Sequence, residues 1–518
     1  MPAIVTDQFR ILNASNFVDS ISDTDNSYYV FVGLSNPTAT NGSAERSADW
    51  NTDTPNPDDS IDYSNFVGDN MIFGKRATTD NVRRVVRRID WARGTKYEMY
   101  RHDYSLTNPS PITQSARLYD SNYYVINSEY KVYICIDNGS SGINTNGNAS
   151  LDEPTFTDLE PAAAGNSGDG YLWKYLFTVT PSDIVKFDST EYISLPNNWS
   201  TSTNAQITAV RENGDSDENQ NQIKKVYIEN PGASYKTANQ VELPILGDGT
   251  GGQVVVTITG GQVTSAVISA GGSGYTYGMV DLSAYQPSTI TTPAHLIPII
   301  PPSRGHGFDL YKELGADRVL VYARFDDSVK DFPSDTVFSE IGIVKNPTTF
   351  GSNNVITSNQ FSALGAIKLT AAFSGEPAVG DRITQTTVTG GTARGIVASY
   401  DETTRVLKYF QDRSLHFNQT NRDQSDYSTV STTARSYAFE SGGGTIQSTS
   451  FSGSIETGFS GVTTTVSNQI VSLDANFTNG IANYEINKKS GEIIYIDNRP
   501  AITRSPRQKE DVKIILEF

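Results

Sequence analysis

The stretch RRVVRRIDWARG concentrates guanidinium groups at Arg83, Arg84, Arg87, Arg88 and Arg93. A guanidinium is planar and always charged, and it pairs with carboxylates or phosphates through parallel hydrogen bonds. Such a cluster can grip an anion. The more common use of clustered charges is a set of salt bridges with an acidic partner or a neighbouring domain. Both interpretations stay open from the sequence, and the five arginines are candidates for a partner interface.

A second polar group of residues lies near the C-terminal end, in SGEIIYIDNRPAITRSPRQKEDVKIILEF. Asp497 and Arg499 fall between two apolar, β-type runs, and Pro500 follows directly. Proline lacks an N–H and restricts the preceding residue to extended conformations, so the segment predicts a fixed turn in a closing hairpin. No nucleophile with a suitable base lies nearby in sequence. We expect Asp497 and Arg499 to hold either the terminal strand or another subunit.

The segment GDGTGG at 247–252 has the G-x-G-x-x-G spacing of a dinucleotide-binding loop. That loop binds a pyrophosphate only where it opens a helix, because the helix N-terminus supplies the N–H groups. Here the run QVVVTIT follows, and its composition is typical of a strand. The sequence therefore predicts a hairpin turn at this position and no cofactor.

The four histidines show no spacing typical of a metal site, since none has a ligand partner at i+4 or a similar distance. They are His102, His295, His306 and His416. Two acidic segments, 19–26 and 53–60, do not fit the twelve-residue calcium loop and are expected to be exposed loops. Neither a nucleophile elbow nor a Walker loop is present. We therefore expect no metal and no cofactor, while a catalytic pair of carboxylates, which depends on spatial proximity, stays open from the sequence.

The composition indicates a mainly β protein that is rich in loops. The 518 residues include 27 Tyr, 22 Phe and 42 Gly, while 37% are apolar and 19% are charged. Aromatic side chains fit pleated surfaces, and glycine fits turns. The net charge of −18 disfavours binding to nucleic acid, because phosphates require a basic surface.

Cysteine usage and hydropathy indicate a protein that folds inside a cell. Cys135 is the single cysteine, so no disulfide can form within the chain, as is typical of a reducing cytoplasm. The beginning MPAIVTDQFR has no signal-peptide pattern, and no apolar run reaches the ~20 residues of a membrane helix. We expect a soluble protein that is not exported by a classical route and does not insert into a membrane.

Changes in composition along the chain predict a β-sandwich-rich, discontinuous body with few short helices and two inserted small β-modules. One of the few helices is expected at 79–89, with Thr79 or Asp80 as its N-cap. Insertions into exposed loops are tolerated, because the entropy of loop closure grows slowly with length. The predicted body comprises residues 1–204, 291–348 and 466–518, and the predicted modules comprise 205–290 and 349–465.

The first predicted module contains two segments of similar sequence. IENPGASY at 228–235 returns as ISAGGSGY at 268–275, an offset of 40 residues that aligns Tyr235 with Tyr275. Between them, two β-type runs flank Gly260-Gly261, which is a strong signal for a two-residue hairpin turn. A module with only two such units is too short for a solenoid.

Several motif blocks occur in an order that is similar to a known family. The most specific blocks are GDGYLWKYLF at 168–177 and IIYIDNRP at 493–500, which is followed by the terminal VKIILEF. The other blocks are TEYISLP (190–196), SEIGIVKNP (339–347), RRIDWARGTKY (87–97) and the segment 9–21. Together they resemble the baseplate wedge subunit, the product of gene eight, of T-even-type contractile-tailed bacteriophages. The two predicted modules depart from that family's pattern.

The resemblance implies a structural role. Subunits of this family look like β-sandwich-rich homodimers that contact other baseplate wedge subunits and the short-tail-fibre-bearing protein. The baseplate changes shape when the tail contracts. The resemblance further implies a place in the virion tail after assembly in the host cytoplasm, with no enzymatic activity and no cofactor. The five arginines would then pair with carboxylates across a wedge interface.

A carbohydrate-binding or carbohydrate-cleaving tail protein is the alternative. Gly-rich β-modules and aromatic side chains motivate it, since sugars stack on aromatic faces. The tryptophans are Trp50, Trp91, Trp173 and Trp199. Trp173 lies in an alternating run, which favours burial in the core over exposure to a sugar.

Overall fold

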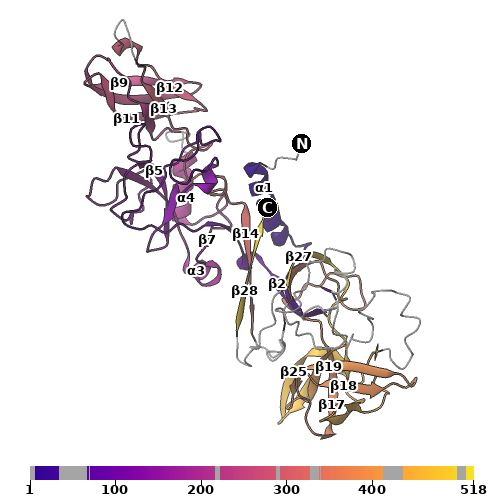
Figure 1. Ribbon diagram of the computed structural model, residues 1–518. Coiled ribbons are helices and arrows are strands. Elements are labelled where there is room, and N and C mark those ends of the chain that lie inside the picture. The colour runs from indigo at the N-terminus through magenta and orange to yellow at the C-terminus, as the bar shows by residue number, and fades with distance from the viewer. Residues whose placement is uncertain are drawn as a thin grey trace, which may run out of the picture. The chain divides into compact units, whose positions relative to one another are not determined.

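The computed structural model is mainly β, with 43% of the residues in strands and 12% in helices, which confirms the expected fold class. Figure 1 shows the strands grouped into several separate sheets. The structure describes residues 6–33, 67–68, 70–215, 222–286, 292–326, 338, 340–411, 436–498 and 509–518.

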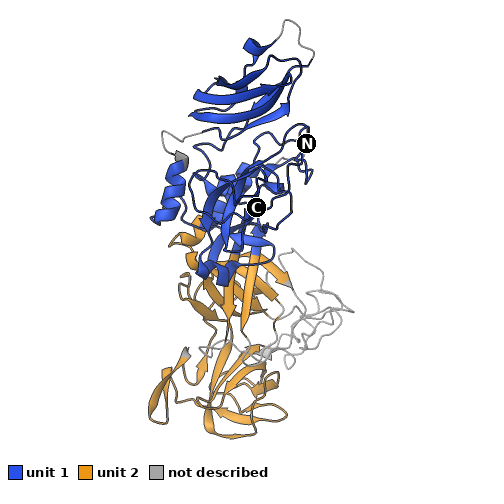
Figure 2. Cartoon of the chain, turned by 90° about the vertical axis from the view of Figure 1, so that its left-hand side faces the viewer, with its two compact units in different colours: residues 1–18, 82–320, 515–518 blue, residues 19–81, 321–514 orange. Residues whose placement is uncertain are grey.

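The chain forms two compact units (Figure 2). Unit 1 comprises residues 1–18, 82–320 and 515–518, and unit 2 comprises residues 19–81 and 321–514. The predicted layout of one body with two inserted modules has different boundaries and stays a prediction.

The centre of unit 1 is an antiparallel sheet with the order β4-β5-β6. The strands are β4 (Tyr124–Ile126), β5 (Lys131–Asn138) and β6 (Tyr171–Thr178). Most positions of β5 and β6 are buried, and a strand covered on both faces has an almost continuous apolar sequence. Cys135 lies opposite Trp173 in the register. Both side chains are fully buried, which confirms the burial predicted for each.

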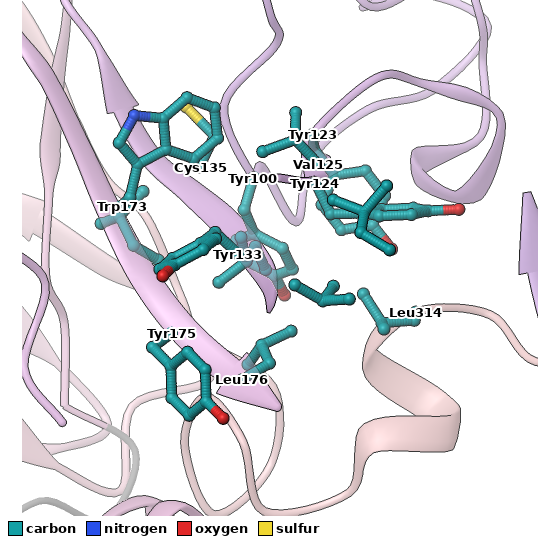
Figure 3. Close-up of a cluster of buried hydrophobic side chains, with 14 of the residues drawn as sticks. Tyr100, Tyr123, Tyr124, Val125, Tyr133, Cys135, Trp173, Tyr175, Leu176 and Leu314 are labelled. Carbon is teal, nitrogen blue, oxygen red and sulfur yellow. The ribbon is translucent and has the colours of Figure 1, made fainter. Parts of the chain in front are cut away.

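An aromatic core surrounds this sheet (Figure 3). Trp173 stacks on Tyr171 with ring centroids 5.2 Å apart, and Tyr97 makes an edge-to-face contact with it at 5.8 Å. Tyr133 meets Tyr175 edge to face at 5.7 Å. Such pairs contribute about 0.5–1.5 kcal/mol each beyond the burial of their area. The block 168–177 therefore supplies the middle of this core.

A four-stranded sheet has the order β28-β14-β3-β7. Its strands are β3 (Val82–Arg87), β7 (Tyr192–Ser194), β14 (Arg318–Phe325) and β28 (Glu510–Glu517). The helix predicted at 79–89 is wrong, because only a 3-10 turn, η1 (Thr79–Asn81), precedes strand β3. Val82, Val85 and Val86 are buried in the sheet. β-Branched side chains lose χ1 freedom in a helix and pack well in a sheet, and this packing decides the conformation.

The described helices are few. Helix α3 begins with Pro181, and its N-cap Thr180 accepts a hydrogen bond from the Asp183 N–H at 3.2 Å. This cap stabilises the first turn of α3, which carries Asp183. The helices are α1 (Asp7–Ser22), α3 (Pro181–Phe187), α4 (Ala205–Asp215) and α5 (Leu310–Glu313), and two further 3-10 turns are η2 (Leu118–Asp120) and η3 (Ser283–Tyr285).

Residues 223–300 form a small core of their own within unit 1, which we call the glycine-rich module. Its sheet has the order β11-β10-β9-β12, and β8 pairs with β13. The strands are β8 (Val226–Asn230), β9 (Ala238–Gly247), β10 (Thr250–Thr259), β11 (Gln262–Ser273), β12 (Gly278–Val280) and β13 (His295–Pro298). GDGTGG turns between β9 and β10, and Gly260-Gly261 turns between β10 and β11, so both predicted turns are confirmed.

The two similar segments of the glycine-rich module, 228–235 and 268–275, also repeat a structural feature. Gly232 and Gly272 have φ angles of +73° and +65°. A Cβ on either glycine would lie 2.6 Å or 2.7 Å from the ring of Tyr235 or Tyr275, respectively. Both rings are buried, and each hydroxyl is hydrogen-bonded to a backbone group, at 2.9 Å and 2.8 Å. Glycine is required at both positions because the tyrosine ring fills the space that a side chain would need.

Unit 2 contains a five-stranded antiparallel sheet with the order β16-β2-β1-β15-β27. Its strands are β1 (Tyr28–Gly33), β2 (Met71–Ala77), β15 (Glu340–Lys345), β16 (Gln360–Ser362) and β27 (Glu492–Asn498). The predicted closing hairpin is wrong, because β27 pairs with β15 while β28 belongs to the other sheet. The connection between β27 and β28 is far longer than a hairpin turn, so each strand finds its partner elsewhere.

Other strands of unit 2 close a small barrel, which the sequence analysis did not predict. The order is β18-β22-β23-β17-β20-β19, and pairing of β18 with β19 closes the ring. The strands are β17 (Gly365–Ser374), β18 (Arg382–Thr386), β19 (Thr392–Asp401), β20 (Val406–Gln411), β22 (Ile446–Gln447) and β23 (Ser452–Ile455). Ile367, Ile383 and Leu407 belong to its apolar interior.

Four further strands of unit 2 lie outside the ring of the barrel. β21 (Ser436–Tyr437) pairs with β19, and β26 (Ile481–Ala482) pairs with β17. The strands β24 (Gly461–Val466) and β25 (Gln469–Phe477) form a separate hairpin. Its turn residues, Ser467 and Asn468, both have positive φ angles, as a two-residue hairpin turn requires.

Candidate functional site

Strand β3 and the residue after it carry four of the five candidate arginines, and helix α3 lies beside them with two carboxylates. Arg83 binds the Asp183 carboxylate through Nε and Nη2, at 3.1 Å and 3.0 Å. Its guanidinium also lies 5.0 Å from the centroid of the Phe187 ring. Arg83 therefore joins β3 to α3 by charge and by a cation–π contact.

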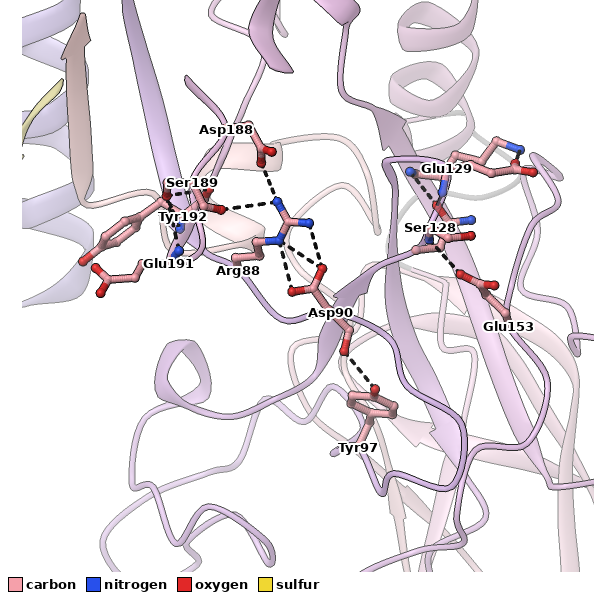
Figure 4. Close-up of polar contacts among 12 residues, drawn as sticks. Arg88, Asp90, Tyr97, Ser128, Glu129, Glu153, Asp188, Ser189, Glu191 and Tyr192 are labelled. Carbon is pink, nitrogen blue, oxygen red and sulfur yellow. Dashed lines mark hydrogen bonds and ion pairs between the residues drawn. The ribbon is translucent and has the colours of Figure 1, made fainter. Parts of the chain in front are cut away.

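Arg88 joins three segments of unit 1 (Figure 4). Its Nε donates to both carboxylate oxygens of Asp90, at 3.0 Å and 3.1 Å, and its Nη1 binds Asp188 at the end of α3. The same Nη1 donates to the Ser189 carbonyl at 3.3 Å. Hydrogen bonding to Asp90 raises the pKa of the Arg88 guanidinium above its ordinary value. Arg88 thus lies at the centre of an intramolecular network.

Arg84 and Arg87 are also used within unit 1. Arg84 is 4% exposed, and its guanidinium lies 4.2 Å from the centroid of the Tyr311 ring. Arg87 donates from Nη2 to the Ser121 carbonyl at 3.0 Å, while its own carbonyl accepts from the Tyr124 hydroxyl at 2.7 Å. These contacts correspond to the intramolecular interpretation of the cluster, in which the arginines bind neighbouring segments of the same chain.

Arg93 differs from the other four arginines because it is exposed. Hydrogen bonds from Ser167 lower the pKa of the Asp152 carboxyl, and the charge of Arg93 contributes to the same shift. The structure therefore groups Arg83, Arg84, Arg87 and Arg88 but leaves Arg93 on the surface.

The two C-terminal candidates do not belong to strand β3, which carries the arginines. Asp497 is half-buried in β27, opposite Ile341 of β15, and belongs to unit 2. Arg499 falls outside the described residues. The roles predicted for both in holding the terminal strand or another subunit stay predictions.

Tyrosine hydroxyls brace the irregular segments of unit 1, and the sequence analysis missed this arrangement. Many donate to backbone carbonyls that no strand or helix uses, over distances of 2.6–3.2 Å. The donors in this group are Tyr97, Tyr104, Tyr119, Tyr123, Tyr133 and Tyr171. The only signal in the sequence was the excess of tyrosine over phenylalanine. Each such bond satisfies a carbonyl in a loop or at the C-terminal end of α5 while the ring packs against its neighbours.

His306 forms a buried pair with Glu313 of helix α5. Its Nδ1 lies 2.6 Å from Glu313 Oε1, while Glu313 Oε2 accepts from the Gly307 N–H at 2.6 Å. The side chains are 4% and 0% exposed, and the ring of Tyr100 meets the imidazole edge to face at 4.8 Å. The pair orients the RGHGF loop from inside the core, where it is closed to a substrate.

The other histidines and the described acidic groups do not assemble into a metal site. Burial lowers the pKa of His102, which accepts a hydrogen bond from the Ile300 N–H at 3.2 Å. His295 pairs with Glu229, and His416 lies outside the described residues. Among the described residues, no group of three or more His, Cys, Asp or Glu side chains could hold a metal ion.

The described tryptophans do not form a surface platform for sugars. Trp173 and Trp199 are 0% and 1% exposed. Trp91 is half-buried, and its indole N–H donates to Ser150 Oγ at 3.0 Å. Trp50 lies outside the described residues. The stacking surface that motivated the carbohydrate alternative is therefore not supplied by these three side chains.

Comparison with known proteins does not assign the chain to a family, because no protein-family model and no curated protein matches it. Within the described parts of the chain, no helix has both the length and the apolar character needed to cross a bilayer.

Proposed function

We propose that this chain is a structural, non-enzymatic subunit of the tail baseplate wedge of a contractile-tailed bacteriophage. In this proposal it forms a homodimer, contacts other wedge subunits and the short-tail-fibre-bearing protein, and takes part in the conformational switch on tail contraction. It is assembled in the host cytoplasm and resides in the virion tail.

The observation that carries the proposal is where the resembling blocks lie in the fold. The blocks 339–347 and 493–500 are far apart in sequence, yet their strands β15 and β27 are antiparallel neighbours. The block 190–196 contains β7, and the terminal VKIILEF contains most of β28, both in one four-stranded sheet. The blocks 190–196, 339–347, 493–500 and the terminal VKIILEF thus supply strands of two sheets.

The parts of the chain that depart from the family pattern have cores of their own. The core of the glycine-rich module uses residues from Ile223 to Ile300, and the barrel interior uses residues from Ile367 to Ile455. Neither set includes a residue of the resembling blocks. A framework with added modules is the organisation expected of a family member that has acquired insertions.

The contacts that hold the segments of unit 1 together fit a part of a virus particle that has to withstand mechanical force. Arg83 and Arg88 tie strand β3 and the segment after it to helix α3, and tyrosine hydroxyls close the loops around the central sheet. These contacts link segments that lie 23 to 190 residues apart, so moving one segment away from the other would break a hydrogen bond. This rigidity supports a structural role.

The proposal is tested by locating the chain in purified particles. An antibody raised against the full chain should decorate the tail end of intact phage in negative-stain micrographs, and a cryo-electron map should hold the chain in the baseplate. Particles incubated with a pre-immune antibody provide the control. Absence of the chain from purified particles, or its location in the head, would overturn the proposal.

A partner role for the arginines is best tested at the exposed Arg93. In a pull-down with the other wedge subunits, Arg93→Glu should weaken capture while leaving the melting temperature unchanged. Reversal at Arg88 does not discriminate, because that change breaks the network with Asp90 and Asp188 inside the chain. Unaltered capture by the Arg93→Glu chain would remove Arg93 from the interface.

A further inference from the structure

The glycine-rich module joins the rest of unit 1 through the two-stranded ribbon of β8 and β13. Neighbouring residues of this ribbon serve two different cores. Val226 and Ile300 belong to the core of the module. Tyr227 and Ile299, which lie next to them in the sequence, belong to the aromatic core around the central sheet. We call the contacts between this ribbon and the rest of unit 1 the joint.

Two contacts of the joint connect the ribbon to β5 and the loop after it. Lys225 forms an ion pair with Asp137 of β5. The Gly142 N–H donates to the Ile228 carbonyl at 2.8 Å. A Cβ on Gly142 would lie 1.6 Å from the Glu229 carbonyl oxygen, so only glycine permits this close approach. Neither contact involves histidine, the side chain that ordinarily changes charge between pH 5 and pH 8.

His102 supplies a third contact of the joint. The Ile300 N–H donates to Nδ1 of His102 at 3.2 Å. Only a neutral imidazole with its proton on Nε2 can accept this bond, because both ring nitrogens are donors in the imidazolium. A proton on Nδ1 would place two N–H groups against each other. This contact therefore exists only while His102 is neutral.

The surroundings of His102 favour the neutral ring. Burial lowers the pKa of His102, while the charge of Asp103 raises this pKa and that of Arg101 lowers it. Arg101 and Asp103 form an ion pair at 2.5 Å, so their two charges largely offset each other. On the module's side, the Tyr227 ring lies 4.2 Å from the Arg101 guanidinium. Further charged groups of the ribbon and of the segments beside it form the pairs Lys225–Asp137, Lys224–Glu160 and His295–Glu229.

We propose that His102 makes the joint between the glycine-rich module and the rest of unit 1 sensitive to acid. In neutral solution the ring accepts from Ile300 and holds the end of the ribbon. In acid the ring binds a proton, the hydrogen bond is lost, and the ribbon opens more often at Ile300. This inference does not depend on the proposed function.

Linkage gives the sign and the pH window. The pKa of His102 is lowered in the folded chain, while an exposed histidine has a pKa of about 6.5. The open joint therefore binds the proton more readily than the closed joint. The stability that the contact contributes is present above about pH 6.5 and is lost as the pH falls below that value.

His295 predicts that the effect stays confined to the joint. It lies in β13 and pairs with Glu229 of β8 across the ribbon. Protonation turns this pair into an ion pair, so acid does not weaken the pairing of β8 with β13 at this position. The module should therefore remain folded while its attachment loosens.

The first test measures hydrogen exchange of the native full chain at pH 7.5 and pH 5.5, by mass spectrometry with single-residue fragmentation. The protection factor of the Ile300 amide, corrected for the intrinsic rate, should fall several-fold. The fall should not exceed about tenfold, because one proton binds to an open state with a pKa of about 6.5. Protection of Val256, in β10 between β9 and β11, should stay constant. Unchanged protection at Ile300, or an equal loss at Val256, overturns the inference.

Two matched substitutions assign the effect to one histidine. His102→Gln keeps an oxygen that can accept from the Ile300 N–H at any pH, so Ile300 should be protected equally at both pH values. His295→Gln makes the same change at the other histidine of this region and should keep the pH dependence of the native chain. Full pH dependence in His102→Gln, or its loss in His295→Gln, overturns the role of His102.

A second measurement needs no substitution. In nitrogen NMR of the deuterated native chain, the hydrogen bond should give a scalar coupling between the Ile300 nitrogen and Nδ1 of His102 at pH 7.5. That coupling should vanish at pH 5.5. A His102 ring that carries its proton on Nδ1 at pH 7.5 overturns the inference.

Discussion

Arg88 shows how a residue that looks available for a partner is already engaged. It contacts Asp90, Asp188 and the Ser189 carbonyl, and its side chain is 17% exposed. In the sequence Arg88 and Arg93 have the same status, because local spacing does not reveal which carboxylates the fold brings near. One carboxylate, Asp90, is two residues away, but the other, Asp188 at the end of α3, is 100 residues further along the chain.

Replacing Arg88 by methionine should lower the free energy of unfolding of unit 1 by about 1–3 kcal/mol, because two carboxylates lose their charged hydrogen-bond donor. Arg93→Met is the matched control and should change stability by less than about 0.5 kcal/mol, since an exposed side chain makes little contribution. Urea unfolding followed by tyrosine fluorescence measures both. Equal stability of the two variants would contradict the role assigned to Arg88.

Lys174 is a buried cation at the centre of unit 1. It is 1% exposed in strand β6, and its Nζ donates to the Leu159 carbonyl at 2.5 Å. Burial lowers the pKa of its ammonium to about 8. The folded protein therefore releases this proton at a lower pH than the unfolded chain, whose lysine pKa is about 10.4.

Below pH 8 the burial of Lys174 costs stability, and the cost shrinks as the pH rises from about 8 to about 10.4. Lys174→Met should therefore raise the melting temperature at pH 7 and lose that advantage by pH 10. The Leu159 carbonyl keeps a donor, because Asn213 Nδ2 lies 3.2 Å from it. Calorimetry at both pH values checks this. If the variant were less stable than the native chain at pH 7, the contacts of the ammonium would contribute more free energy than its desolvation costs.

At the scale of elements, glycine decides the turns of the glycine-rich module. Gly260 and Gly272 have nearly equal φ angles, +61° and +65°. A Cβ on Gly260 would meet no atom within 4 Å, whereas a Cβ on Gly272 would lie 2.5 Å from the Gly252 nitrogen and the Thr250 oxygen. A comparison of substitutions at Gly260 and Gly272 therefore distinguishes the cost of a positive φ angle from the cost of a steric clash.

Gly260→Ala should cost about 1 kcal/mol, the strain of a left-handed conformation in an L-residue. Gly272→Ala should cost several times more, because backbone atoms of the adjoining strand must also move. Hydrogen exchange of the β10 and β11 amides reports the stability of the module directly. Similar losses in the two variants would mean that the strand relaxes around the added methyl group.

At the scale of the whole molecule, buried tyrosines link stability to alkaline pH. Burial raises the pKa of Tyr29 in unit 2 and of Tyr119 in unit 1 to about 12, and it also raises the pKa of Tyr100 and Tyr123 well above the ordinary value. Above pH 10 the unfolded chain loses these protons while the folded chain keeps them. The free energy of unfolding must then fall as the pH rises from about 10.

Thermal unfolding should shift to lower temperature between pH 10 and pH 12, in both units. The absorbance of tyrosinate at 295 nm should rise in two stages: first for exposed tyrosines, then abruptly as the fold is lost. Ionisation of all 27 tyrosines near pH 10 with unchanged circular dichroism would contradict the burial of their hydroxyls.

The sequence by itself determined the features that depend on neighbouring residues. The β-rich composition, the turns at 247–252 and Gly260-Gly261, and the burial of Trp173 and Cys135 all follow from local patterns. Glycine permits positive φ wherever it stands, and an apolar run between turns seeks burial whatever its partner.

Only the tertiary structure decided which segments meet. It paired β27 with β15 instead of β28, closed the barrel, turned the expected helix at 79–89 into strand β3, and gave four arginines their partners. The physical reason is that strand pairing and burial are set by packing between segments far apart in the chain, which local propensity cannot encode.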